Sequence, residues 1–106
     1  MYQEKTDIFS SEKLPLMQDA WVLFRFKDHE VIRLHLAPGD SMENHINDWR
    51  IIFFVLRGRG SLTIEGSLYE LQTEQSIAVE AGKERFWSNP GDQMLELLVI
   101  KTRDQE

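Results

Sequence analysis

Short apolar or alternating runs, separated by turn-forming residues at close intervals, dominate this sequence of 106 residues. Side chains alternate between the two faces of a strand, so runs of this length and period predict strands rather than helices. Clusters such as Pro38-Gly39-Asp40 and Asn89-Pro90-Gly91-Asp92 predict turns. The predicted strands cover residues 21–26, 30–36, 49–57, 61–65, 67–71, 76–80, 84–88 and 94–101. The pattern therefore predicts an all-β single domain over residues 21–106, preceded by a partly irregular N-terminal segment, residues 1–20.

The strand over residues 49–57 is apolar on both faces. Ile51, Phe53 and Val55 share one face, and Ile52, Phe54 and Leu56 share the other. The outer face of a strand in a small domain normally faces water, so a second layer is expected to cover it. We expect a homodimer formed by packing of sheets. The alternative is that residues 1–20 lie over this face in a monomer.

Composition narrows the range of partners. The formal net charge is −6, with 12 Lys and Arg against 18 Asp and Glu. Nucleic-acid binding needs clustered positive charge, so we expect no nucleic-acid partner. No apolar run reaches the ~20 residues of a membrane span and the N-terminus does not resemble a signal peptide, so we expect a cytoplasmic protein with no membrane contact. The absence of cysteine excludes disulfides and thiolate metal sites.

Two spaced motifs carry a resemblance to a known family. From Gly39 to Gly58 the spacing is a glycine, five residues, His45-x-Asn47, three residues, Ile51, six residues and a glycine. The segment 74–89 keeps Ala81-Gly82 and ends at Asn89, with Glu74 in a glycine position, Glu80 in a proline position and Arg85 in a histidine position. This spacing resembles the two motifs of the cupin family, and the resemblance covers residues 30–101. It implies a small jelly-roll-like β-barrel.

The same resemblance implies a site that typically holds a metal ion. The family's ligands, three histidines and a glutamate, correspond here to His45, Asn47, Ile51 and Arg85. One good donor is kept, Ile51 offers none, and Arg85 places a permanent positive charge beside the ion. We therefore expect no metal and no other cofactor. A rearranged metal site using Glu43 or His35 beside His45 is the alternative.

The strand alternation predicts a ligand-binding lumen. If the register of the resemblance holds, His45, Asn47, Trp49, Ile51 and Phe53 face inward from one strand. Arg85 and Trp87 face inward from another, which gives an apolar wall with a few converging polar groups. The predicted ligand-binding residues are therefore His45, Asn47, Trp49, Phe53, Arg85 and Trp87, with Arg85 suited to a carboxylate or phosphate.

Structural interpretations of these residues stay open. Arg85 could be paired with an internal acid, namely Glu43, Asp48 or Glu96. His45 could be bonded to backbone, and the two tryptophans could simply fill the interior.

Three functions are compatible with these residues. The first, which we favour, is a metal-free module that binds or senses a small molecule, either anionic or sugar-like. The second is a metal-independent isomerase or epimerase with His45 as base and Arg85 as stabiliser of negative charge, although no Tyr or Lys in the matched positions supplies an acid. The third is a metal-dependent cupin oxygenase or isomerase with a rearranged site. The favoured function involves no catalysis.

Overall fold

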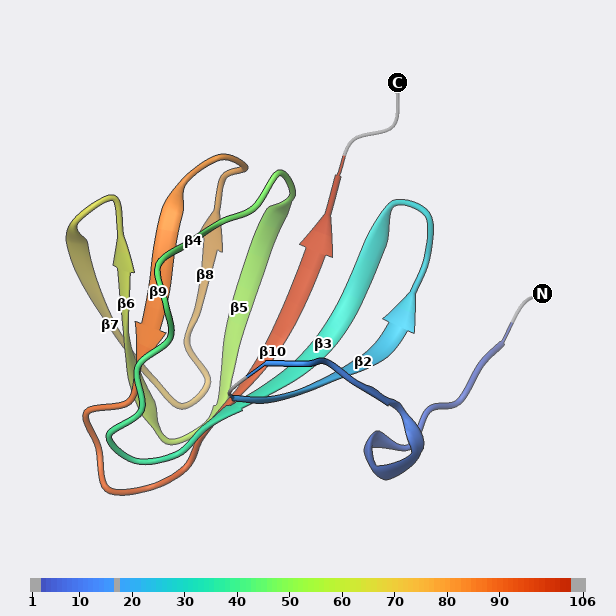
Figure 1. The fold of residues 1–106 in the computed structure, drawn as a ribbon, viewed down its shortest axis with the longest axis horizontal. Helices are drawn as coiled ribbons and strands as arrows, with labels where there is room; N and C mark the ends of the chain where they lie inside the picture. Colours follow the sequence, from blue (N-terminus) through green and yellow to red (C-terminus); the bar gives the residue numbers. More distant parts are fainter. Residues whose placement is uncertain (1–2, 17, 104–106) are drawn as a thin grey trace.

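The fold consists of two antiparallel sheets that face one another (Figure 1). The computed structural model describes residues 3–16 and 18–103. The larger sheet has the order β1 (Glu12–Lys13), β2 (Asp19–Arg25), β3 (His29–Leu36), β10 (Leu95–Thr102), β5 (Arg50–Arg57) and β8 (Ser76–Val79). The smaller sheet has the order β4 (His45–Ile46), β9 (Glu84–Ser88), β6 (Arg59–Ile64) and β7 (Ser67–Gln72). The expected all-β fold is confirmed.

The core lies between the two sheets and follows the strand alternation. On β10 the side chains of Leu95, Leu97 and Val99 are buried, and on the neighbouring β5 those of Ile51 and Phe53 are buried. From the smaller sheet, β6 contributes Leu62 and β9 contributes Trp87, which meets Phe53 edge to face with ring centroids 5.4 Å apart. In the described part of the chain the sheets form two hydrogen-bonded units rather than one closed ring. No helix among the described residues has the length and apolar character to cross a bilayer.

All eight predicted strands are present, with ends shifted by at most two residues. Two further strands, β1 and β4, contain two residues each and are largely polar, so no apolar period marks them. The N-terminal segment also contains a short 3₁₀ turn, η1 (Ile8–Ser10). These short elements form because neighbouring strands offer backbone partners, which the local sequence does not indicate.

The outer face of β5 stays partly uncovered. Ile52 is 37% exposed, and Phe54 and Leu56 are partly buried. The described part of the N-terminal segment lies elsewhere: β1 pairs with β2 at the far edge of the larger sheet, and Thr6 Oγ1 donates a hydrogen bond to Leu23 O. Strands β3 and β10 separate that edge from β5. The homodimer stays a prediction.

Two turns next to the core require unusual backbone conformations. Gly58 has φ +83°, and a Cβ there would lie 2.6 Å from Met94 O, so only glycine fits. Glu74 has φ +71° although it is not glycine, in the turn where its N–H donates to Val55 O. The glycine position that Glu74 occupies is therefore a left-handed one, which costs an L-residue free energy.

Candidate functional site

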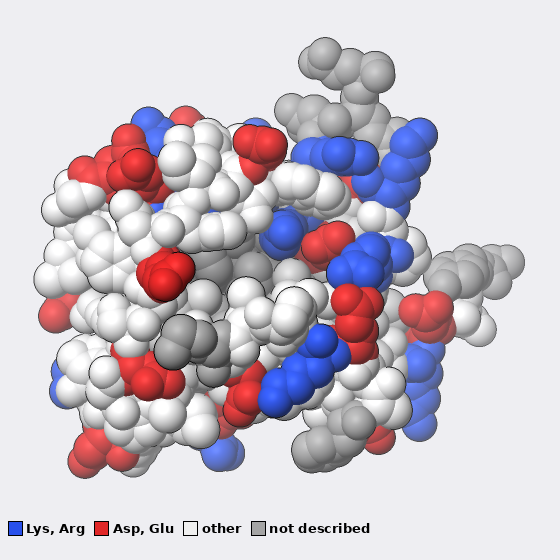
Figure 2. Space-filling view, viewed as in Figure 1, with Lys and Arg blue, Asp and Glu red and all other residues white. Residues whose placement is uncertain are grey.

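A cavity of about 570 Å³ opens between the inner face of the larger sheet and strands β4 and β9. Its third wall is the N-terminal segment around Leu14, Leu16 and Gln18. In the space-filling view the molecule is hollowed near its centre, and basic and acidic side chains lie next to one another beside the hollow (Figure 2). The size is in the ordinary range for a small-molecule pocket, ~300–1,000 Å³.

The floor of the cavity is apolar. Strands β2, β3, β5 and β10 each supply at least one buried aliphatic or aromatic side chain, because each strand turns alternate residues inward. These floor residues are Ala20, Ile32, Leu34, Ile51, Phe53 and Val99. The polar lining comes mainly from the opposite side, where the chain passes from Ser41 to Asn47 and β9 carries Arg85.

Arg85 is a buried cation in this cavity. Residue pairing between β4 and β9 sets it directly opposite His45, and its side chain is only 6% exposed. Nη1 donates a hydrogen bond of 3.1 Å to the backbone oxygen of His45, and the guanidinium carbon lies 6.0 Å from the centre of the Phe53 ring. Nε is buried and has no hydrogen-bond partner among the described residues. Burial lowers the pKa of Arg85, because removal from water disfavours the charged form.

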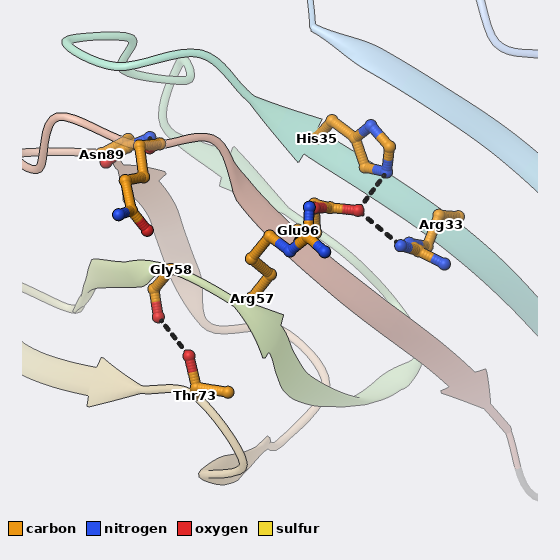
Figure 3. A network of polar contacts seen from close by, with 8 residues as sticks. Arg33, His35, Arg57, Gly58, Thr73, Asn89 and Glu96 are labelled. Carbon is orange, nitrogen blue, oxygen red and sulfur yellow. Dashed lines mark hydrogen bonds and ion pairs between the residues drawn. The ribbon is translucent and has the colours of Figure 1, made fainter.

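No described acidic residue forms an ion pair with Arg85. Glu96, one of the three expected partners, extends toward Arg33 and His35 (Figure 3) and does not line the cavity. Its carboxylate lies 2.6 Å from Arg33 Nη2, 3.5 Å from His35 Nε2 and 3.4 Å from Arg57 Nε. Alternation on β10 explains this direction, since Leu95 and Leu97 on either side of Glu96 point into the core.

His45 sits at the rim of the cavity. Partial burial of its ring, followed by the nearby charges of Arg85 and Lys101, lowers the pKa of this histidine below its usual 6.5. The imidazole is therefore neutral at neutral pH, with one nitrogen able to donate and the other able to accept a hydrogen bond.

The remaining predicted site residues divide into two groups. Asn47 and Phe53 line the cavity with His45 and Arg85, although Asn47 Oδ1 already accepts the backbone N–H of Trp49. Trp49 and Trp87 do not line it. Trp49 has Lys101 and Arg103 over its ring, and Trp87 is 2% exposed in the core.

Lys101 is a cavity residue that the sequence analysis missed. It follows Leu95, Leu97 and Val99 in the inward-facing alternation of β10, so the strand period carried the signal for its placement. Its ammonium group lies 3.5 Å from Glu30 Oε1. Residues 14–16 and 18 also line the cavity. The N-terminal segment is expected to pack on the barrel or on a partner subunit, but no local pattern predicts that it forms a cavity wall.

The side chains at the four expected ligand positions do not fit a metal ion. Asn47 Oδ1 is engaged by backbone, Ile51 is apolar and 2% exposed, and Arg85 contributes a cation. Among residues 3–16 and 18–103, no three His, Cys, Asp or Glu side chains gather in a way that could hold a metal. His45 is then a single donor beside a positive charge, which does not make a transition-metal site.

Comparison with known proteins agrees with this geometry. A family model described as "Cupin domain" matches residues 32–101. The chain belongs to the cupin family. The expected jelly-roll fold is thereby confirmed. A search of curated proteins gives no sequence match.

Solved structures of other proteins share this fold at low sequence identity. The Schizosaccharomyces pombe Cnp3 cupin domain is 14% identical with a TM-score of 0.83, over 92% of this chain and 72% of that one. KdgF from Halomonas sp. is 10% identical with a TM-score of 0.81, over 98% and 97%. The polyketide cyclase RemF from Streptomyces resistomycificus is 14% identical with a TM-score of 0.82, over 97% and 81%. Such different proteins on one fold show that the role of this cupin must be argued from its own cavity.

Proposed function

We propose that this cupin is a metal-free module that binds a small organic anion in its cavity, with Arg85 receiving the negative charge. The observation that carries the proposal is a guanidinium that is 6% exposed, lines a cavity of about 570 Å³ and forms no ion pair with a described acidic residue. The neighbouring solved structures contribute the fold alone.

An unpaired buried charge is costly, and this cost favours an anionic ligand. Removing a charged group from water costs several kcal/mol, and a counter-charge with good hydrogen-bond geometry offsets much of it. The single hydrogen bond to His45 O leaves Nε without a partner. A carboxylate that enters the cavity would accept from the guanidinium and supply the missing counter-charge.

His45 would assist as a neutral hydrogen-bonding group. Its pKa is lowered by burial and by two neighbouring cations, so it does not compete with Arg85 as a second fixed charge. A bound carboxylate would reverse part of this effect, because a negative charge close to the ring favours the protonated form. Binding should therefore strengthen as the pH falls toward the pKa of His45.

Isothermal titration with hexanoate and with hexanamide tests the proposal, since the two probes differ mainly in charge. Hexanoate should bind and hexanamide should bind at least ~10-fold more weakly, because a charge-assisted hydrogen bond contributes ~1.5–3 kcal/mol. The variant Arg85→Met should lose the same discrimination. Arg50→Met makes the same change in net charge at an exposed position at the start of β5, and should bind like the wild type. Equal binding of hexanoate by wild type and Arg85→Met would refute the proposal.

A further inference from the structure

We infer that the anion is a monoacid with an apolar body, such as an alkyl or aryl carboxylate, rather than a sugar acid or a sugar phosphate. This inference rests on the proposed function and concerns the same cavity. It is carried by the distribution of apolar and polar groups around Arg85 and by which of those polar groups are already bonded within the protein.

The apolar floor extends over four strands. Ile32 and Leu34 from β3 and Val99 from β10 lie next to one another in the larger sheet, where Val99 pairs directly with Ile32. Each is less than a tenth exposed. Ile51 and Phe53 continue this surface across β5 toward Arg85. A ligand whose charged end meets Arg85 would therefore place its body against hydrocarbon, which favours methyl and methylene groups over hydroxyls.

Part of the polar lining is already engaged within the protein, while Gln18, Ser41 and Glu43 also line the cavity. Asn47 Oδ1 accepts from Trp49 N, Asn44 Nδ2 donates to Glu84 Oε2, and the Lys101 ammonium group lies against Glu30. A sugar carries several hydroxyls, and each hydroxyl buried without a partner weakens binding. One guanidinium and one neutral imidazole suit a single carboxylate. The other donors and acceptors that a sugar ring needs would have to come from Gln18, Ser41 and Glu43 alone.

The cavity also has room for such a body. A volume of about 570 Å³ corresponds to roughly twenty water molecules at ~30 Å³ each. Linear acids of four to eight carbons are therefore suitable probes. Expelling water from the floor should make each added methylene favourable until the floor is covered.

Calorimetric titration with butyrate, hexanoate, octanoate and gluconate tests the inference. Gluconate has the six carbons and the single charge of hexanoate but carries five hydroxyls, so it isolates the character of the body. The dissociation constant should fall about four-fold for each methylene in the linear series. Gluconate should bind at least ~10-fold more weakly than hexanoate.

The nearly isosteric variant Val99→Thr provides a matched change in the floor. It adds a hydroxyl to the surface of β10 that faces the cavity, so the gain per methylene should decrease while the dependence on Arg85 remains. Thermal unfolding of the variant checks that the fold is intact. The linear series in the wild type tests the inference independently should Val99→Thr fail to fold.

The outcomes separate this inference from the proposed function. If hexanoate and gluconate bind equally well and Arg85→Met weakens both, the inference of an apolar ligand body is refuted, but the proposal of anion binding stands. No binding by any of the four acids, or binding that Arg85→Met does not change, would overturn both. A gain with each methylene together with dependence on Arg85 would support both.

Discussion

Replacing Arg85 by methionine should stabilise the ligand-free protein, although the same change should abolish anion binding. Methionine keeps a flexible stem of similar length and removes the charge. The effective cost of burying one charge is several kcal/mol after relaxation. The hydrogen bond from Arg85 to His45 O offsets about 1.5–3 kcal/mol of it. This hydrogen bond is only partly buried, so water can replace the guanidinium as the donor to His45 O in the variant. The expected gain is about 1–2 kcal/mol in the free energy of unfolding.

Urea denaturation of wild type and Arg85→Met at pH 7, without any added anion, measures this gain. In thermal scans a gain of 1 kcal/mol should raise the midpoint by ~4–8 °C for a domain of about this size. Arg50→Met controls for the change in net charge and should stay within ~0.5 kcal/mol of the wild type. A loss of more than ~1 kcal/mol in Arg85→Met would mean that the guanidinium is satisfied within the fold, and the argument for an anionic ligand would then fail.

Three further predictions concern the rim, the outer face and one turn. In an NMR titration His45 should show a midpoint below 6.5 that moves upward in Arg85→Met, because a nearby cation is removed. An unchanged His45 midpoint in Arg85→Met would contradict this prediction. Because folding lowers the pKa of His45, its contribution to stability is complete above pH 6.5 and declines as the pH falls through 6.5 toward the folded pKa. Ile52→Glu should convert the expected dimer to a monomer in analytical ultracentrifugation, whereas Leu68→Glu, at a more exposed apolar position on β7, should not. A monomeric wild type would refute that prediction. Glu74→Gly should raise the free energy of unfolding, measured in urea, by about 0.5–1 kcal/mol. Glycine removes the cost of the left-handed conformation, but its more flexible unfolded chain offsets part of this gain. A lower stability would contradict the argument.

The fold could be predicted from the sequence because it follows from period and spacing. Two-residue alternation marks strands, and Gly58, which ends the first motif, lies in a turn where a side chain does not fit. Asn89, which closes the second motif, is 1% exposed, and its amide donates to Leu36 O and Gln93 O. Such residues maintain backbone geometry, so their positions identify the fold even where the site has changed.

The site could be predicted only in part, because its walls come from long-range contacts. Strand alternation correctly predicted that Arg85 and Phe53 face the cavity. The same alternation predicted an inward direction for Trp49 but could not indicate that two cations would lie over its ring. Trp87 faces inward as expected, yet packing against Phe53 leaves none of its surface in the cavity. Neighbouring strands fill the interior and decide which inward-facing residues stay accessible to a ligand. Strand alternation carries no information about this packing.

The N-terminal wall links ligand occupancy to the local stability of the chain. Residues 14–16 and 18 reach the cavity next to the two-residue strand β1, which is held by exposed ion pairs such as Lys13–Asp19 and by the hydrogen bond from Leu14 N to Ala20 O. Exposed ion pairs contribute little, so this wall should open more readily than the sheets behind it. If contact with this wall strengthens ligand binding, the bound ligand must stabilise the wall by the same free energy. Hydrogen exchange and proteolysis of the wall should then become slower. Protection of the Leu14 amide is therefore a measure of occupancy that requires no knowledge of the ligand.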